Sequence, residues 1–498
     1  MRKTAKALLL VLVALIGSAG LAVASAFTAA FAFGAIALIV PGTGTHNVDT
    51  ATQYRDNAAF RYVDPAGIPV CTTATSCNTV GVDYPATFFP LVIFNGWCPG
   101  LSCDTWNKSV GTGVFNLNEE VHDQIDADPT QQIVIFGYSQ GGAVVSQELD
   151  ALNADPTIDK SKISVVTIGN INNPLGLWSR LSFLPTIPGL DISFGPQLPT
   201  DGIKSTNYSF EYDPVGDAPQ YWGNPVAMLN ALAAFEYVHG FYLSPNENGE
   251  TDTLPYGYND ATLAYALAHT ATVAQYQNAT FVLIPQQGAL PIYQPFVDLA
   301  NTTGTRALVD PVISLVQPLT KVLINLGYDR ETNPGIPRTL SILPFNPFQN
   351  WVKVGEDLAG ATVEGVTNVV NGVDVTKPPT TPPADSSLVE DKTSNVTDLL
   401  SKQTPTTVVD KDAAAPVAKV KATPLKDTPL KDTPLKDTVA KLNDVTKNKP
   451  VATAVKKAVA TVKATVDKVK TAVDKVTAPK KTEAAASEKT SKKTKDAA

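Results

Sequence analysis

The sequence predicts an α/β fold with a central, mostly parallel β-sheet, because short apolar, β-branched segments alternate with helical patterns along residues 27–375. Residues 133–136 form one buried-strand pattern, and apolar residues recur at helical spacing soon after it. Further strand patterns occupy residues 35–40, 162–169 and 207–212. Since strands that alternate with helices usually pair in parallel, we expect these segments to share one sheet.

Other segments of this region are expected to flank the sheet. Residues 80–86 resemble the end of another strand, and residues 115–125 and 225–237 have the apolar spacing of helices. Residues 175–201 are rich in Pro, Gly and Leu and lie between two strand patterns. Because long insertions at the ends of such strands often shape access to a site, this segment is expected to form a lid or a pocket wall.

The sequence Gly137-Tyr138-Ser139-Gln140-Gly141 lies where the strand at residues 133–136 passes into the following helix. A Gly-x-Ser-x-Gly motif in this context is typical of a nucleophile elbow, in which a tight turn projects the serine oxygen above the sheet. The alternative is a glycine-rich loop that merely opens a helix. With a strand before it and a helix after it, the motif favours an α/β-hydrolase fold with Ser139 as the nucleophile.

A second loop of interest follows the first strand pattern. Pro41 ends the apolar segment and opens the loop Gly42-Thr43-Gly44-Thr45. In an α/β hydrolase, the loop after an early core strand supplies an oxyanion donor, which must approach the scissile carbonyl closely. We therefore expect a donor near Thr43, and an ordinary turn is the alternative.

A serine nucleophile needs a histidine base, and the chain has four histidines. In α/β hydrolases the base follows the serine in the sequence, which disfavours His46 and His122. His269 lies within a helical pattern, whereas His239 lies just past a helix, next to a glycine. His239 is therefore the predicted base, and a packing or surface histidine is the alternative.

Two aspartates compete to be the acid that orients the histidine. Asp213 follows the strand pattern at residues 207–212 directly, and Asp217 lies four residues further on. The acid must reach sideways to the imidazole, and by Asp217 the chain is expected to have turned above the edge of the sheet. The sequence therefore favours Asp217, with Asp213 as the alternative acid.

All four cysteines, Cys71, Cys77, Cys98 and Cys103, fall in one short segment. Their spacing favours two local disulfides, Cys71–Cys77 and Cys98–Cys103, although four cysteines permit three connectivities. A zinc site would need paired cysteines or histidines at ligand spacing, and no C-x-x-C motif is present. We expect no metal and no cofactor.

The two ends of the chain have compositions unlike the middle. Residues 1–26 show the basic, apolar and small-residue regions of a signal peptide, although apolar residues continue to residue 40, which leaves an uncleaved membrane anchor as the alternative. Export also suits the predicted disulfides. We therefore expect a protein that is secreted or associated with the cell envelope.

Aromatic residues stop before residue 376, and residues 376–450 are expected to be an extended linker with three Thr-Pro-Leu-Lys-Asp repeats. Residues 451–498 carry twelve lysines against five acidic residues, and valines recur there at spacings of four and three. Such a basic, partly helical tail could dimerise, or bind a membrane surface or an acidic cell-wall polymer. Nucleic acid is an unfavoured partner for an exported chain.

Several motifs in this order resemble the PE-PPE domain family of actinobacterial serine hydrolases, which are relatives of cutinases. They are the loop at residues 42–45, Asp83-Tyr84-Pro85-Ala86, the elbow, residues 212–219, Asn230-Ala231-Leu232, Tyr237-Val238-His239 and Asn325-Leu326-Gly327-Tyr328. The resemblance covers about residues 33–350. Gly141 departs from it, since many members have serine there.

The resemblance implies an α/β hydrolase that acts on lipophilic carboxylic esters through an acyl-enzyme on Ser139. It also implies that the Gln140 amide and a donor near Thr43 hold the oxyanion. Some members are acyltransferases, so transfer of an acyl chain to a sugar such as trehalose is a second hypothesis. A non-catalytic envelope protein that acts through its basic tail is a third, and a serine peptidase is disfavoured.

Overall fold

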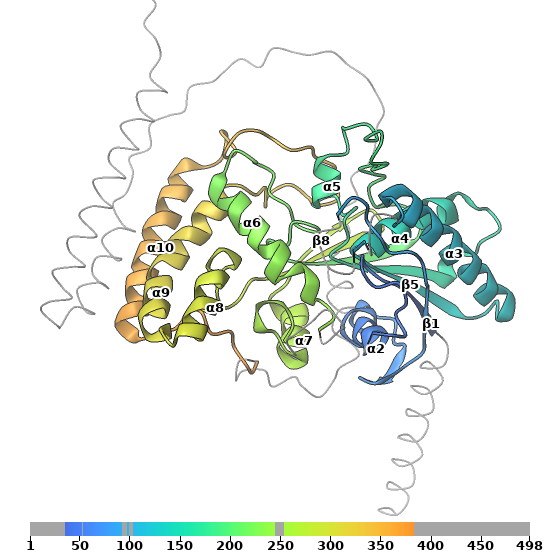
Figure 1. The fold of residues 1–498 in the computed structure, drawn as a ribbon, viewed down its shortest axis with the longest axis horizontal. Coiled ribbons are helices and arrows are strands. Elements are labelled where there is room, and N and C mark those ends of the chain that lie inside the picture. Colours follow the sequence, from blue (N-terminus) through green and yellow to red (C-terminus); the bar gives the residue numbers. More distant parts are fainter. Residues whose placement is uncertain (1–34, 52, 92–96, 99–102, 245–252, 383–498) are drawn as a thin grey trace, which may run out of the picture.

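A seven-stranded sheet forms the centre of the computed structural model, which describes residues 35–51, 53–91, 97–98, 103–244 and 253–382 (Figure 1). The strand order is β4-β1-β5-β6-β7-β9-β8. The strands are β1 (Ala35–Val40), β4 (Thr79–Gly81), β5 (Gln132–Tyr138), β6 (Ile163–Ile168), β7 (Lys204–Phe210), β8 (Thr272–Tyr276) and β9 (Ala279–Ile284). A small hairpin, β2 (Cys71–Thr73) with β3 (Ser76–Cys77), lies outside this sheet.

All neighbouring strands of the sheet pair in parallel except β8, which runs antiparallel to β9 at one edge. In the register, Val40 pairs with Gly137, Tyr138 with Ile168, and Ile168 with Tyr208. The loops after β1, β5, β6 and β7 therefore all leave the sheet at the carboxyl ends of its strands. In open parallel sheets, ligand sites form at these carboxyl ends.

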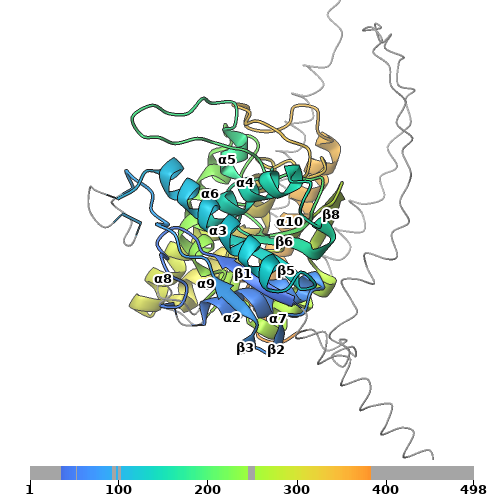
Figure 2. The same cartoon turned by 90° about the vertical axis from the view of Figure 1, so that its right-hand side faces the viewer.

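Helices cover both faces of the sheet, and Figure 2 shows α3 and α4 on the opposite side from α2 and α7. The helices of four or more residues are α2 (Tyr54–Ala58), α3 (Trp106–Ala127), α4 (Gln140–Ala154), α5 (Leu177–Arg180), α6 (Pro225–Tyr237), α7 (Asp260–His269), α8 (Gln294–Thr303), α9 (Arg306–Asn325) and α10 (Trp351–Asn371), with a π-turn η1 (Ala59–Val63). Two separate apolar clusters result, one on each face. The central strands are buried on both sides, which explains why they are apolar throughout.

The α/β-hydrolase fold and the mostly parallel sheet that the sequence predicts are confirmed. The helix predicted at residues 225–237 has the same bounds in the structure. The strand predicted at 207–212 is shifted and becomes β7, which ends at Phe210 because Tyr212 adopts a left-handed backbone with φ 71°. Within residues 175–201, only the short helix α5 is regular.

The predicted local disulfides are both present. Cys71–Cys77 joins β2 to β3, and Cys98–Cys103 joins two residues of the segment before α3. The predicted signal peptide at residues 1–26, most of the linker and the basic tail at 451–498 lie outside the described residues.

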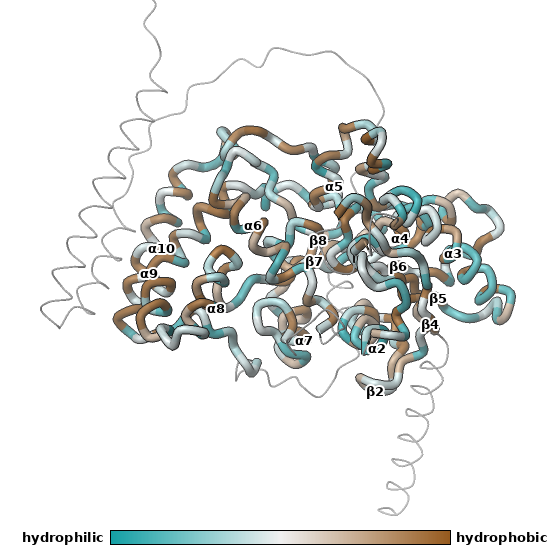
Figure 3. Tube along the Cα trace, viewed as in Figure 1, coloured by the Kyte–Doolittle hydropathy of each residue, from teal (hydrophilic) through white to brown (hydrophobic). Residues whose placement is uncertain are grey.

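Helices α8, α9 and α10 gather at the end of the molecule away from α3 (Figure 1). The sequence gives only a weak helical signal for α9, because Pro311 and Pro318 lie inside this helix. Helix α9 is also apolar and long enough to span a membrane by composition, and only 28% of its most apolar stretch is buried. Figure 3 shows hydrophobic residues along α8 and α9.

The close packing of α10 on α9 depends on a glycine. Gly365 is buried against α9, and a Cβ atom there would overlap the backbone carbonyl oxygen of Leu315. Gly360 lies in the same helix, is exposed, and has no atom within 4 Å of the place of a Cβ atom. The two glycines therefore differ in packing and share the same helical backbone.

We predict that Gly365→Ala destabilises the protein by about 1 to 3 kcal/mol, because α10 must move away from α9 to admit the methyl group. Gly360→Ala is the matched control and should stabilise the protein by about 0.5 to 1 kcal/mol through its better helix propensity. Denaturant unfolding of both variants measures the difference. Equal effects of the two substitutions would contradict the packing described.

Candidate active site

Ser139 stands at the turn between β5 and α4. Its backbone has φ 54° and ψ −115°, a strained conformation for a residue other than glycine, of the kind that nucleophile elbows adopt. A Cβ atom on Gly137 would lie 2.7 Å from the Gly141 carbonyl oxygen, so the turn closes only with glycine there. Ser139 remains partly exposed, and α4 begins at the next residue.

His239 lies beside Ser139 although the two are 100 residues apart in the sequence. It follows α6 in a short 3-10 turn, and its Nε2 lies 2.9 Å from Ser139 Oγ. The Phe235 ring stacks on the imidazole at 5.7 Å between ring centroids and an interplanar angle of 9°. The histidine is 6% exposed, so these neighbours leave it one orientation.

Asp213, the alternative acid of the sequence analysis, contacts the other imidazole nitrogen. Its Oδ2 lies 2.9 Å from His239 Nδ1, and its Oδ1 accepts a hydrogen bond from the Val215 N–H at 3.0 Å. An ionised carboxylate only accepts hydrogen bonds, so Nδ1 carries the proton of the neutral imidazole. Nε2 is then the acceptor for the Ser139 hydroxyl, which is the arrangement that a general base requires.

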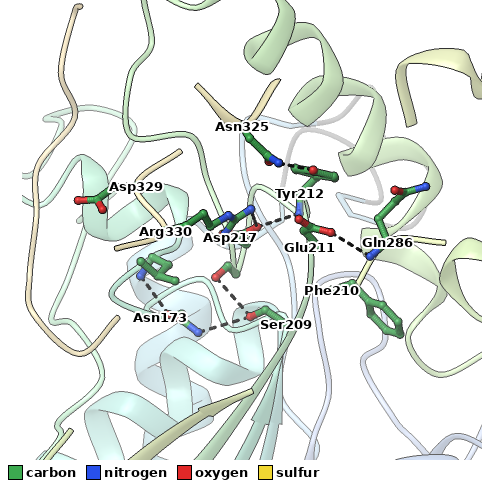
Figure 4. A network of polar contacts seen from close by, with 12 residues as sticks. Asn173, Ser209, Phe210, Glu211, Tyr212, Asp217, Gln286, Asn325, Asp329 and Arg330 are labelled. Atoms are coloured by element: carbon green, nitrogen blue, oxygen red, sulfur yellow. Dashed lines mark hydrogen bonds and ion pairs between the residues drawn. The ribbon is translucent and has the colours of Figure 1, made fainter. Parts of the chain in front are cut away.

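The prediction that Asp217 contacts and orients His239 is wrong, because Asp213 makes that contact. Asp217 forms a two-pronged ion pair with Arg330, at 2.5 Å from Nη1 and 2.8 Å from Nη2, and also accepts the Tyr212 N–H (Figure 4). The chain reverses after Asp213, since the Asp217 N–H bonds back to the Asp213 carbonyl. This reversal aims Asp217 toward Arg330, and Asp213 toward the histidine.

The environment of Arg330 holds this ion pair in place. The guanidinium lies 4.4 Å from the centroid of the Tyr328 ring and 5.8 Å from that of Tyr212, as in cation–π contacts. Burial alone would lower the pKa of Arg330, but the Asp217 carboxylate, together with Glu211 and Tyr212, outweighs burial and raises that pKa. Arg330 is therefore charged, and it anchors the loop that carries Asp213.

The loop after β1 lies directly against Ser139. A Cβ atom on Gly42 would be 3.1 Å from the Ser139 Cβ, and the Gly42 N–H donates to the Tyr54 hydroxyl. The side chain of Gln140 is bound elsewhere, because it accepts from Ser109 Oγ and donates to the Thr87 carbonyl, each at 3.0 Å. Only its backbone amide could face an oxyanion, and the oxyanion roles of Gln140 and Thr43 stay predictions.

The other three histidines lie in the described part of the chain and bond elsewhere. His46 contacts the Pro85 carbonyl, while His122 and His269 each bond to a carbonyl one turn earlier in their own helices. Among the described residues, no group of acidic, histidine or cysteine side chains could hold a metal ion.

No pattern in the sequence identifies Arg330 or Tyr242 as part of the site. Tyr242 is fully buried, and its hydroxyl donates to Asp213 Oδ2 at 2.7 Å. Arg330 lies 113 residues from Asp217, so no local spacing connects them. The motif 325–328, which the resemblance included, ends two residues before Arg330 and is the nearest sequence signal.

The family model for the PE-PPE domain matches residues 75–329 of this chain, which is about half of its length. The chain belongs to the PE-PPE domain family. The matched region contains Ser139, Asp213 and His239, and it leaves out β1 and the loop at residues 42–45.

Several curated proteins of Mycobacterium tuberculosis are similar to this PE-PPE domain protein. PPE family protein PPE42 (strain CDC 1551 / Oshkosh) is 28% identical over 64% of this chain and 48% of its own length. Esterase PE16 (strain ATCC 25618 / H37Rv) is 27% identical over 68% of this chain and 57% of its length. SL1278 acyltransferase Chp1 (strain ATCC 25618 / H37Rv) is 27% identical over 53% and 58%. The chain thus spans about half the length of these relatives.

A solved structure with partial similarity is the catalytic core domain of acetyl xylan esterase from Trichoderma reesei. It is 16% identical, and the match covers 35% of this chain and 82% of that chain with a TM-score of 0.23.

We predict that Asp217→Asn destabilises the PE-PPE domain by about 1.5 to 3 kcal/mol, because it removes the buried carboxylate that pairs with Arg330, whose side chain is 28% exposed. The matched control is Asp49→Asn, which breaks an exposed ion pair with Arg55 and should cost less than about 0.5 kcal/mol. Denaturant unfolding compares the two. A loss no greater than that of the control would contradict a structural role for the Asp217–Arg330 pair.

Proposed function

We propose that this PE-PPE domain hydrolyses carboxylic esters through an acyl-enzyme on Ser139. The observation that carries the proposal is the continuous chain of contacts from Ser139 Oγ through His239 to Asp213, with both distances at 2.9 Å. A serine hydroxyl is a weak nucleophile at neutral pH, and a neutral imidazole that accepts its proton activates it. Esterase PE16, a relative by sequence, agrees with an ester as the substrate.

In the proposed reaction, Ser139 Oγ attacks the acyl carbonyl carbon while His239 Nε2 takes the hydroxyl proton. The negative charge that forms on the carbonyl oxygen would be held by the Gln140 amide and a donor near Thr43, each contributing about 3 kcal/mol to the transition state. His239 then returns the proton to the leaving alcohol. Water repeats the sequence on the acyl-enzyme and releases the carboxylic acid, and Asp213 keeps the imidazole in one tautomer throughout.

The surroundings of His239 favour a lipophilic acyl group. Helix α6, which ends two residues before His239, exposes Leu229 and Leu232 by 57% and 69%. Phe235 on the same helix covers the imidazole and also contacts the Trp97 ring at 6.0 Å. An apolar approach of this kind would accept an acyl chain more readily than a charged peptide.

An acyltransferase is the second candidate, because SL1278 acyltransferase Chp1 is among the relatives. The first half of the reaction would be the same, and a sugar hydroxyl such as one of trehalose would replace water in the second half. We propose further that the protein is secreted or associated with the cell envelope, and that its basic tail binds a membrane surface or a cell-wall polymer.

The first test is turnover of a short-chain p-nitrophenyl ester by the full chain. Ser139→Ala should lower kcat by about 10⁴-fold or more, and fluorophosphonate should label the unaltered protein but not this variant. If the unaltered protein neither turns over esters nor reacts with fluorophosphonate, the fold is a non-catalytic scaffold. If the protein is then retained in the cell envelope but a variant without residues 383–498 is not, the tail is the part that binds the envelope.

The two aspartates provide a sharper comparison. Asp213→Asn should lower kcat by about 10⁴-fold, since an amide no longer favours the tautomer with a proton on Nδ1. Asp217→Asn should keep kcat within about threefold at a temperature where it is folded, because Asp217 does not touch the imidazole. The reverse order of effects would assign the acid to Asp217.

Transfer is tested by adding trehalose to the ester assay and analysing the products by mass spectrometry. An acylated sugar that forms faster than free acid would identify an acyltransferase. Free acid alone, at an unchanged rate, would identify a hydrolase.

A further inference from the structure

Tyr242 contacts Asp213, the proposed acid of the site. It follows the turn that carries His239, and its side chain is fully buried. Its hydroxyl donates to Asp213 Oδ2 at 2.7 Å, which is the same oxygen that faces His239 Nδ1. The hydroxyl oxygen in turn accepts the Phe210 N–H at 2.9 Å. Because a backbone N–H can only donate, the tyrosine proton is left for the carboxylate.

The ring of Tyr242 is held on several sides. Phe210 meets it edge-on at 4.8 Å, and the rings of Tyr138 and Tyr62 lie at 5.6 and 6.5 Å. These contacts come from three different strands and turns, so the ring cannot rotate without moving the core. The direction of its hydroxyl is therefore fixed by packing, as pre-organised sites require.

The geometry points to Tyr242 as a positioning residue for the proposed hydrolysis: its hydroxyl holds the Asp213 carboxylate in line with His239 and shares the charge on Oδ2. This inference rests on the proposed function. The Val215 N–H holds Oδ1, and Tyr242 holds Oδ2, so the carboxylate has a donor at each oxygen besides the imidazole. Without the tyrosine hydroxyl, Oδ2 loses that donor and its charge acts more strongly on the imidazole.

Tyr242 stays a donor over the range in which the site would work. Burial and then the Asp213 carboxylate raise the pKa of Tyr242 well above 10. The Asp213 carboxylate also raises the pKa of Tyr138, Tyr256 and Tyr328, which lie on neighbouring elements. The charged pairs of this region are Asp217 with Arg330 and Glu211 with Lys321. Burial raises the pKa of these three tyrosines as well, so none of them loses a proton near neutral pH.

The test is Tyr242→Phe, which keeps the ring and removes the hydroxyl. We expect kcat to fall about 10-fold at the pH optimum with KM unchanged, because a hydrogen bond to a charged group is lost. Protonation of His239 should become easier when the Asp213 charge is no longer shared. The acidic limb of the kcat profile should therefore move to higher pH by about 0.5 to 1 unit.

Tyr62→Phe is the matched control. Tyr62 is as buried as Tyr242 and packs on it, but its hydroxyl donates at 3.1 Å to the Tyr242 backbone carbonyl and not to a carboxylate. Tyr242→Phe removes two buried hydrogen bonds, one to Asp213 and one from the Phe210 N–H, and Tyr62→Phe removes one, so both variants should lose thermal stability and Tyr242→Phe should lose more. Only Tyr242→Phe should change kcat and its pH profile.

Two kinetic outcomes would overturn the inference: Tyr242→Phe with the kcat and pH profile of the unaltered protein, or Tyr62→Phe with the same changes as Tyr242→Phe. NMR titration of the histidine rings, with the His239 signal assigned by His239→Gln, gives a reading that needs no turnover. The midpoint of the His239 signal should rise in Tyr242→Phe, and an unmoved midpoint contradicts the inference. Failure of the proposed function is separate, since it appears as no ester turnover by the unaltered protein.

Discussion

The hydrogen bond between His239 and the buried Asp213 is the contact on which the arrangement of the site depends. Because a carboxylate accepts and does not donate, it selects the imidazole tautomer whose free lone pair faces Ser139. The two residues come from different loops, one after β7 and one after α6. The sheet brings them together, since β5, β6 and β7 are neighbours and end at the same edge.

Asp213 and Asp217 lie in one short loop but have different partners, His239 and Arg330. Asp217 is held by Arg330, whose guanidinium lies over the Tyr328 ring, so the loop is fastened to a segment more than a hundred residues away. A cation paired with Asp213 would offset the charge that stabilises a protonated imidazole. The loop thus keeps its arginine on one carboxylate and presents the other to the histidine.

Aromatic side chains surround the contacts among Ser139, His239 and Asp213. Tyr138 and Tyr242 pack beside His239, and the Phe235 ring stacks on the imidazole. Hydroxyl groups of the two tyrosines bond to the His239 backbone carbonyl and to Asp213. Such a shell limits water around the acid and the base, which strengthens their electrostatic interaction. Helix α6 also exposes Leu229 and Leu232, in keeping with the proposed lipophilic substrate.

The sequence by itself determined the features that depend on neighbours along the chain. The strand, glycine and helix patterns around Ser139 indicated the turn, the position of His239 after a helix separated it from the other histidines, and the cysteine spacing indicated the local disulfides. The tertiary structure alone decided which aspartate meets the histidine. That choice depends on a backbone reversal at Asp213 and on Arg330, a partner that no local pattern identifies. The antiparallel edge strand β8 and the proline-containing helix α9 were missed for the same reason, because long-range packing stabilises them against their weak local signals.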